Sequence, residues 1–202
     1  MKELSIGKTI NKNIPKEAFF RNITVAPAVR NKFYSDIQRI ILTYSISPLT
    51  SSIAAGQEIK EIDIMLIELK SDSISDKVLE TIARQTPVTL LFDIIYNDIE
   101  QFAVFHKKLY ATKWFAKDYY VPKIMGIDLD EVWKTLVSQI CGVEVGAEKS
   151  LDAAIDDNEK QEKIMMQIRL LERKLKNEKQ FNRQVDMSNE IKRLKGQLRE
   201  YE

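Results

Sequence analysis

Apolar residues in the first quarter of the chain recur at helical spacing. The stripe begins near Ala28 and stops before Ser47-Pro48, so it predicts one amphipathic helix across this stretch. Its apolar positions are Phe33, Ile37, Ile40, Ile41 and Tyr44. Residues 1–26 have mixed polarity and no period, so we expect irregular chain there, with one helical turn at 16–20.

The next segments alternate between strand and helix patterns. Residues 58–70 are apolar on both faces, which predicts a central strand. A helix is expected from Ser75 or Asp76 to Gln85, and a second strand over 88–96. A strand–helix–strand order predicts that these two strands run parallel. A turn at 97–98 would then bring residues 101–106 antiparallel beside the second strand.

The pattern after the strands completes an α/β (α+β) domain, a small mixed sheet packed with helices, over residues 1–145. Residues 110–127 are rich in aromatic side chains and are expected to fold back over the sheet, and a helix is predicted over 128–140. Large apolar residues are then scarce over residues 146–158, which predicts a linker.

Residues 159–202 predict a helical arm, because they form helix readily and are almost free of Gly and Pro. Two apolar seams have coiled-coil spacing but do not join in phase. The first seam is Ile164, Ile168, Leu171 and Leu175. The second is Met187, Ile191, Leu194, Leu198 and Tyr201. The arm is therefore a helical hairpin or one long coiled-coil helix with a stutter.

Three polar residues lie at the break between the seams: Gln180, Asn182 and Arg183. Asn182 falls on a seam position of the first register, where a buried Asn fixes pairing at a cost in stability. Arg183 can form a bidentate contact with a carboxylate. We therefore expect these three residues, together with the seam, to bind a partner or a second copy of the chain.

Composition narrows the class of protein. The 202 residues carry a formal net charge of +1, so no overall field attracts nucleic acid or membranes. A single cysteine, the absence of an apolar signal segment and the absence of a membrane-length apolar run favour a cytoplasmic protein without membrane contact. The arm is locally basic, since residues 169–199 contain ten Lys and Arg against four Asp and Glu.

The one tempting catalytic pattern is Glu68-Leu69-Lys70 at the end of the first strand, half of a metal-dependent nuclease motif. That motif needs a second acid on the same face, yet Asp63 lies an odd number of residues from Glu68 and so faces away. It also needs a hairpin before the strand, where residues 45–57 resemble a loop. We expect no catalytic residues, no metal site and, without a phosphate-binding glycine loop, no nucleotide cofactor.

Four stretches resemble the bacterial and archaeal domain-of-unknown-function family number 4391. They are Asn-Ile-Pro-Lys-Glu-Ala-Phe-Phe at 13–20, Leu-Thr-Tyr-Ser-Ile-Ser-Pro-Leu-Thr at 42–50, the strand at 61–70, and the segment at 178–195. The last of these is the most specific. The resemblance carries over no catalytic residues. It implies genes that lie beside those for DNA methyltransferases and helicases in restriction-modification loci.

These observations predict a non-catalytic accessory subunit of a restriction-modification or antiphage defence locus. The expected partners are a protein such as the methyltransferase or helicase, a second copy of the arm, or both. Two alternatives remain: a degenerate nuclease that uses Glu68 and Lys70, and a DNA-binding module that uses the basic arm.

Overall fold

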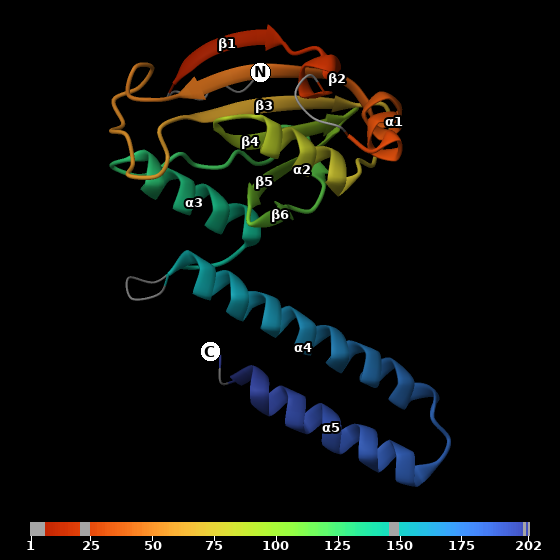
Figure 1. Cartoon of the computed structure of the whole chain (residues 1–202). Coiled ribbons are helices and arrows are strands. Elements are labelled where there is room, and N and C mark those ends of the chain that lie inside the picture. Colours follow the sequence, from red (N-terminus) through yellow and green to blue (C-terminus); the bar gives the residue numbers. More distant parts are fainter. Residues whose placement is uncertain (1–6, 21–24, 146–149, 200, 202) are drawn as a thin grey trace. The chain divides into compact units, whose positions relative to one another are not determined.

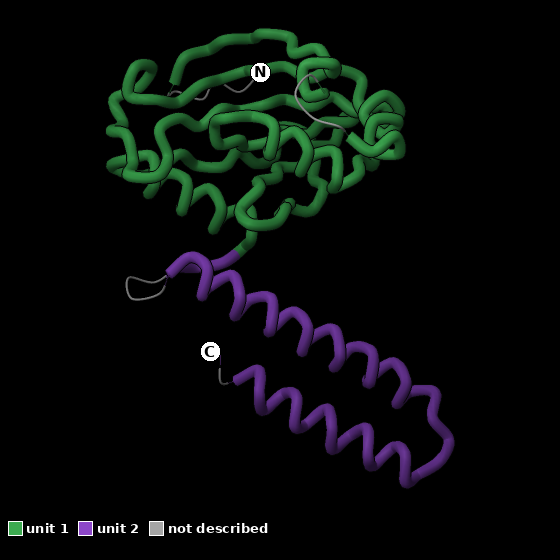
Figure 2. Tube along the Cα trace, viewed as in Figure 1, with its two compact units in different colours: residues 1–142 green, residues 143–202 purple. Residues whose placement is uncertain are grey.

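The chain forms two compact units, residues 1–142 and residues 143–202 (Figures 1 and 2). The computed structural model describes residues 7–20, 25–145, 150–199 and 201. A mixed sheet packed with helices makes up the first unit, and a pair of contacting helices makes up most of the second. This arrangement confirms the predicted α/β domain followed by a helical arm.

The sheet has seven strands, and six of them follow the chain in the order β1-β2-β3-β4-β5-β6. Their bounds are β1 Lys8–Asn13, β2 Ile37–Ile46, β3 Ile62–Leu69, β4 Thr89–Tyr96, β5 Ile99–His106, β6 Lys108–Ala111 and β7 Phe115–Ala116. Strand β7 pairs with β5. Every pairing is antiparallel except β3 with β4, which helix α2 (Asp76–Gln85) connects. The predicted parallel pair and the antiparallel third strand are both confirmed.

The predicted helix from Ala28 is wrong in its second half. Helix α1 covers only Pro27–Asp36, and the chain continues directly into β2. A register shift between Ile37 and Arg39 places an extra residue in β2, so Ile37 and Ile40, three apart, both lie in the core beneath the helices. A bulged strand can thus imitate helical spacing, and the β-branched residues of this run favour the strand.

The expected irregular N-terminal segment is a strand in part. All six residues of β1 are exposed at the edge of the sheet, so no alternation marks the strand in the sequence. Asn11 has a φ of 52°, at the point where the pairing with β2 shifts register. The predicted turn at 16–20 is confirmed as the 3₁₀ helix η1, Lys16–Phe20.

One face of the sheet is covered by η1, α1 and α2 and forms a continuous apolar core. Strands β2 to β5 contribute alternate side chains to it, including the fully buried Ile67, Phe92 and Ile94. Helix α2 adds Val78, Leu79 and Ile82, the side that its spacing predicts. Phe33 of α1 is also fully buried and stacks edge-on against Phe20. The intervening side chains of these strands therefore point to the other face.

The second face carries helix α3, Leu129–Cys141, and the aromatic segment before it. The ring of Phe102 on β5 packs against Phe115 and Tyr120. The Tyr120 hydroxyl donates a hydrogen bond to Gln139 of α3. The side chain of Asp128 accepts from the Glu131 amide and caps the helix, which ends at Gly142 in a left-handed conformation.

The arm is a helical hairpin of α4, Leu151–Asn177, and α5, Phe181–Arg199 (Figure 1). Helix α4 begins eight residues earlier than predicted, with Ser150 as its N-cap, so 151–158 are helical rather than linker. Residues 146–149 of the predicted linker lie outside the described part of the chain. Among the residues that the structure describes, no helix is long and apolar enough to cross a membrane.

Candidate functional site

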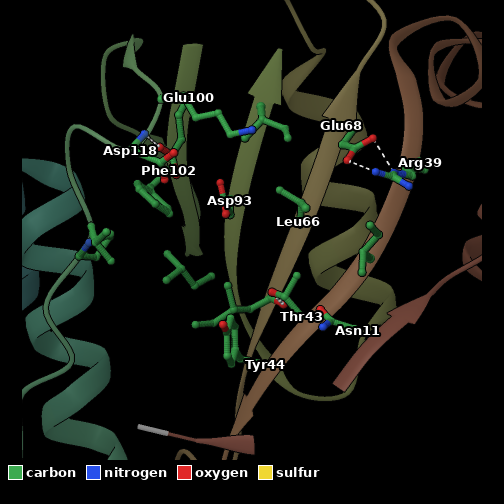
Figure 3. Close-up of a pocket in the computed structure, with 17 residues that line it drawn as sticks. Asn11, Arg39, Thr43, Tyr44, Leu66, Glu68, Asp93, Glu100, Phe102 and Asp118 are labelled. Atoms are coloured by element: carbon green, nitrogen blue, oxygen red, sulfur yellow. Dashed lines mark hydrogen bonds and ion pairs between the residues drawn. The ribbon is translucent and has the colours of Figure 1, made fainter. Parts of the chain in front are cut away.

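A cavity of about 470 Å³ opens on the second face of the sheet (Figure 3). Alternate residues of β2, β3, β4 and β5 form its floor, and Lys117, Asp118, Val121 and Pro122 border it. Its apolar floor includes Leu66, Ile95 and Phe102. Charged side chains lie around this floor, near the carboxyl ends of the two parallel strands, where open α/β sheets commonly bind ligands.

Glu68, the first residue of the tempting catalytic pair, lines this cavity but is held by an arginine. Both carboxylate oxygens accept hydrogen bonds from the Arg39 guanidinium, each at 2.5 Å (Figure 3). Arg39 lies directly opposite on the antiparallel strand β2. The hydrogen bonds to Glu68 raise the pKa of Arg39 above its usual value. This bidentate geometry occupies the oxygens that a metal ion would need.

Lys70, the second residue of the pair, is directed elsewhere. It follows the last residue of β3, and its Nζ donates to the backbone carbonyl of Tyr34 at 2.7 Å. Asp63 alternates with Glu68 as predicted, on the side of β3 that carries the core residues Met65 and Ile67. The structure therefore brings Glu68 into the cavity without Lys70 or Asp63.

The predicted lack of a hairpin before the Glu68 strand is wrong. The loop after residue 46 is preceded by β2, which pairs antiparallel with β3, so a strand does precede the Glu68 strand. Two acids on its face were also missed: Asp93 on β4 and Glu100 on β5 line the same cavity. Strand alternation places both side chains on this face, but alternation along β3 alone does not reveal acids on the neighbouring strands. Within the described ranges, no group of three ligating side chains could hold a metal ion.

Glu100 is the most enclosed of these acids, with 4% of its surface exposed. One carboxylate oxygen accepts a hydrogen bond from the Asp118 amide at 2.8 Å, which ties the bordering segment to β5. The cavity thus combines an arginine–glutamate pair with three further acids, Asp93, Glu100 and Asp118, and with Lys117 above an apolar floor. Its size and its polar rim suit a small polar ligand.

In the arm, most of the predicted seam lies inside the hairpin. Ile168, Ile191 and Leu194 are buried, and half-buried residues pack around them: Ile164, Leu171 and Leu175. Leu198 is half-buried as well. These side chains hold α4 against α5, and partner binding by the seam remains a prediction.

The three polar residues at the break lie at the tip of the hairpin. Helix α4 ends at Asn177, so Asn182 is not on a seam position; it is exposed in the first turn of α5, as Gln180 is just before it. The expected buried Asn is therefore wrong. Arg183 approaches Glu178 at 3.8 Å. The Glu178 carboxylate accepts from the Gln180 and Lys179 amides, and these bonds lower its pKa.

Sequence reasoning missed an aromatic residue at the tip. Phe181 is 74% exposed and Val185, one turn later, is 40% exposed. Both residues fall outside the two seams, and an apolar residue outside a seam is the signal in the sequence that could have indicated an exposed apolar site. We call Gln180, Phe181, Asn182, Arg183 and Val185 the tip patch.

Comparison with known proteins gives one match. The family described as "Domain of unknown function (DUF4391)" matches residues 7–198. The chain belongs to the DUF4391 family. Its match extends from β1 to the last turn of α5, so the DUF4391 domain includes both the sheet and the hairpin. No curated protein and no solved structure gives a significant match.

Proposed function

We propose that this DUF4391 protein is a non-catalytic accessory subunit of a restriction-modification or antiphage defence locus, and that its helical hairpin holds a protein partner in the cytoplasm. The observation that carries the proposal is the tip patch. Phe181 exposes an aromatic ring beside Arg183, and aromatic and arginine side chains dominate the binding energy of protein interfaces. An exposed ring of this kind is more stable against a partner than in water.

The internal packing of the hairpin supports a role for its tip. The seam residues fix α4 against α5, and the Glu178 carboxylate accepts hydrogen bonds from the Lys179 and Gln180 amides in the connection before the second helix. The tip patch is thus presented by ordered helix, which lowers the entropy cost of binding. The α/β domain serves as a packed platform, because Glu68 and Lys70 each already have a partner within the chain.

The expected class of partner comes from the family resemblance, which implies neighbouring genes for a DNA methyltransferase and a helicase. The test therefore uses the tagged methyltransferase and the tagged helicase of the native locus, each co-expressed with the full chain. Phe181→Ser should weaken co-purification with the true partner at least about tenfold. The melting temperature should stay unchanged, because the side chain is already exposed.

Met166→Ser provides a matched control. Met166 is 71% exposed on α4 of the same hairpin, away from the tip. The control variant should bind like the parent. Equal recovery of every variant, or no recovery of either partner with the parent chain, would contradict the proposal.

A further inference from the structure

Two short rows of cations lie on neighbouring sides of α4 and α5. Arg169, Arg173 and Lys176 recur at spacings of four and three residues on α4. Lys192, Lys195 and Arg199 recur at three and four on α5. All six side chains are exposed. Residues at these spacings share one side of a helix, so each row forms a continuous stripe.

An ion pair shows that the two stripes face the same way. Lys195 of α5 donates to Glu172 of α4 at 2.9 Å, across the gap between the helices. Glu172 also lines a shallow depression together with the whole α4 row. The six cations therefore lie on one broad side of the hairpin, which we call the basic face. Glu172 is the one acid that the structure places among them, and Lys195 already neutralises it.

The dimensions of the basic face suit a nucleic-acid backbone. Seven residues of helix span about 10 Å, and packed helices lie about 8–10 Å apart. A duplex carries one phosphate charge per roughly 1.7 Å of axis, so about six phosphates fall within that length. The one apolar residue that lines the depression on the α4 side is Leu175, which packs into the seam, and neither row is interrupted by an aromatic ring that could stack on unpaired bases.

We propose that the basic face of the hairpin binds the phosphate backbone of double-stranded DNA without reading its sequence. Binding would rest on charge and on the release of counterions. If about four of the six cations reach phosphates, the logarithm of affinity should fall with the logarithm of salt with a slope near −3.6. This corresponds to roughly 50-fold weaker binding between about 50 and 150 mM salt.

The test measures anisotropy of a labelled duplex of about 20 base pairs with the full chain, across that salt range. The face variant is Arg169→Gln with Lys192→Gln and Arg199→Gln. It should bind roughly tenfold more weakly at low salt, with a slope shallower by about 2. The matched control removes three exposed cations outside the basic face: Lys163→Gln, Lys174→Gln and Lys179→Gln. The control should keep a slope close to that of the parent.

A third variant guards against misfolding. Arg169→Lys with Lys192→Arg and Arg199→Lys keeps every charge and should bind like the parent. An equal loss in the face and control variants would reduce the effect to net charge and overturn the proposal. The absence of duplex binding by the parent chain would also overturn the proposal. Tighter binding of single strands, double-stranded RNA or poly-glutamate than of the duplex would do the same, and preference for poly-glutamate would assign the face to an acidic protein.

The basic face shares no residue with the tip patch. A loss of DNA binding in the face variant with normal partner recovery, or the reverse in Phe181→Ser, would therefore separate this inference from the proposed protein interaction.

Discussion

Asp63 is a buried carboxylate whose charge should destabilise the fold at neutral pH. It lies at the second position of β3 with 8% of its surface exposed. Burial raises the pKa of Asp63 to about 6, and the nearby charge of Glu61 adds to the rise, whereas a hydrogen bond from Ser45 opposes it. One carboxylate oxygen of Asp63 has no hydrogen-bond partner among the described residues.

The direction of the pH effect follows from the two states. An unfolded Asp titrates near 3.8, so the folded chain retains a proton that the unfolded chain loses between about pH 4 and pH 6. The free energy of unfolding should therefore fall across that window and stay lowered above it. Two pKa units correspond to at most about 3 kcal/mol, and solvent screening reduces this to about 1–2 kcal/mol.

Asp63→Asn removes the charge and keeps the shape, so it should stabilise the α/β domain at pH 8 by about 1–2 kcal/mol. The expected rise in melting temperature is roughly 3–6 °C by calorimetry, and it should shrink towards zero near pH 4. Asp36 is the control: it is 7% exposed but accepts hydrogen bonds from the Ser35 hydroxyl and the Ser75 amide. Asp36→Asn should destabilise. An Asp63→Asn variant no more stable than its parent at pH 8, or shifted equally at both pH values, would refute the reasoning.

Three further predictions concern the cavity and the hairpin. Supercoiled plasmid with Mg²⁺ or Mn²⁺ should stay intact, because Arg39 occupies the Glu68 carboxylate; cleavage that disappears in Glu68→Ala would establish the nuclease instead. Leu194 is 3% exposed in the seam, so Leu194→Ala should lower the free energy of unfolding by about 2–3 kcal/mol. The loss of helicity on heating, followed by circular dichroism, should then occur at a lower temperature. Asn182→Leu, at an exposed tip position, should leave that melting curve unchanged, and a marked stabilisation would restore the buried-Asn interpretation.

Elements with regular alternation or a clean helical stripe could be predicted from the sequence. Strand β3 and helix α2 each bury the residues that their spacing indicates, because one period holds along their whole length. Strand β2 failed this condition, since its bulge puts Ile37 and Ile40 on one face. Strand β1 failed differently: an edge strand with no buried side chain leaves no pattern to detect.

The candidate sites form where distant segments of the chain pair. The sequence pattern of a single strand or helix carries no information about that pairing. Glu68 could be assigned to a face, but Arg39 becomes its neighbour only through the register of β2 with β3. Asp93 and Glu100 joined the same cavity through two further pairings. In the arm, the sequence showed the two seams but did not distinguish a hairpin from one long helix. Phe181 and Asn182 are exposed at the tip because the arm is a hairpin.

A near-neutral total charge concealed a strong separation of charge along this chain. Of its 31 Lys and Arg and 30 Asp and Glu, residues 169–199 hold ten and four, which leaves 21 cations against 26 acids elsewhere. Residues 169–199 therefore carry an excess of six positive charges and the rest of the chain an excess of five negative ones. Screening at physiological salt limits the field of each charged region to about 8 Å. A polyanion such as DNA would therefore be attracted to residues 169–199 although the rest of the chain repels it. The net charge of +1 argued against a nucleic-acid partner only as long as the charges were treated as evenly spread.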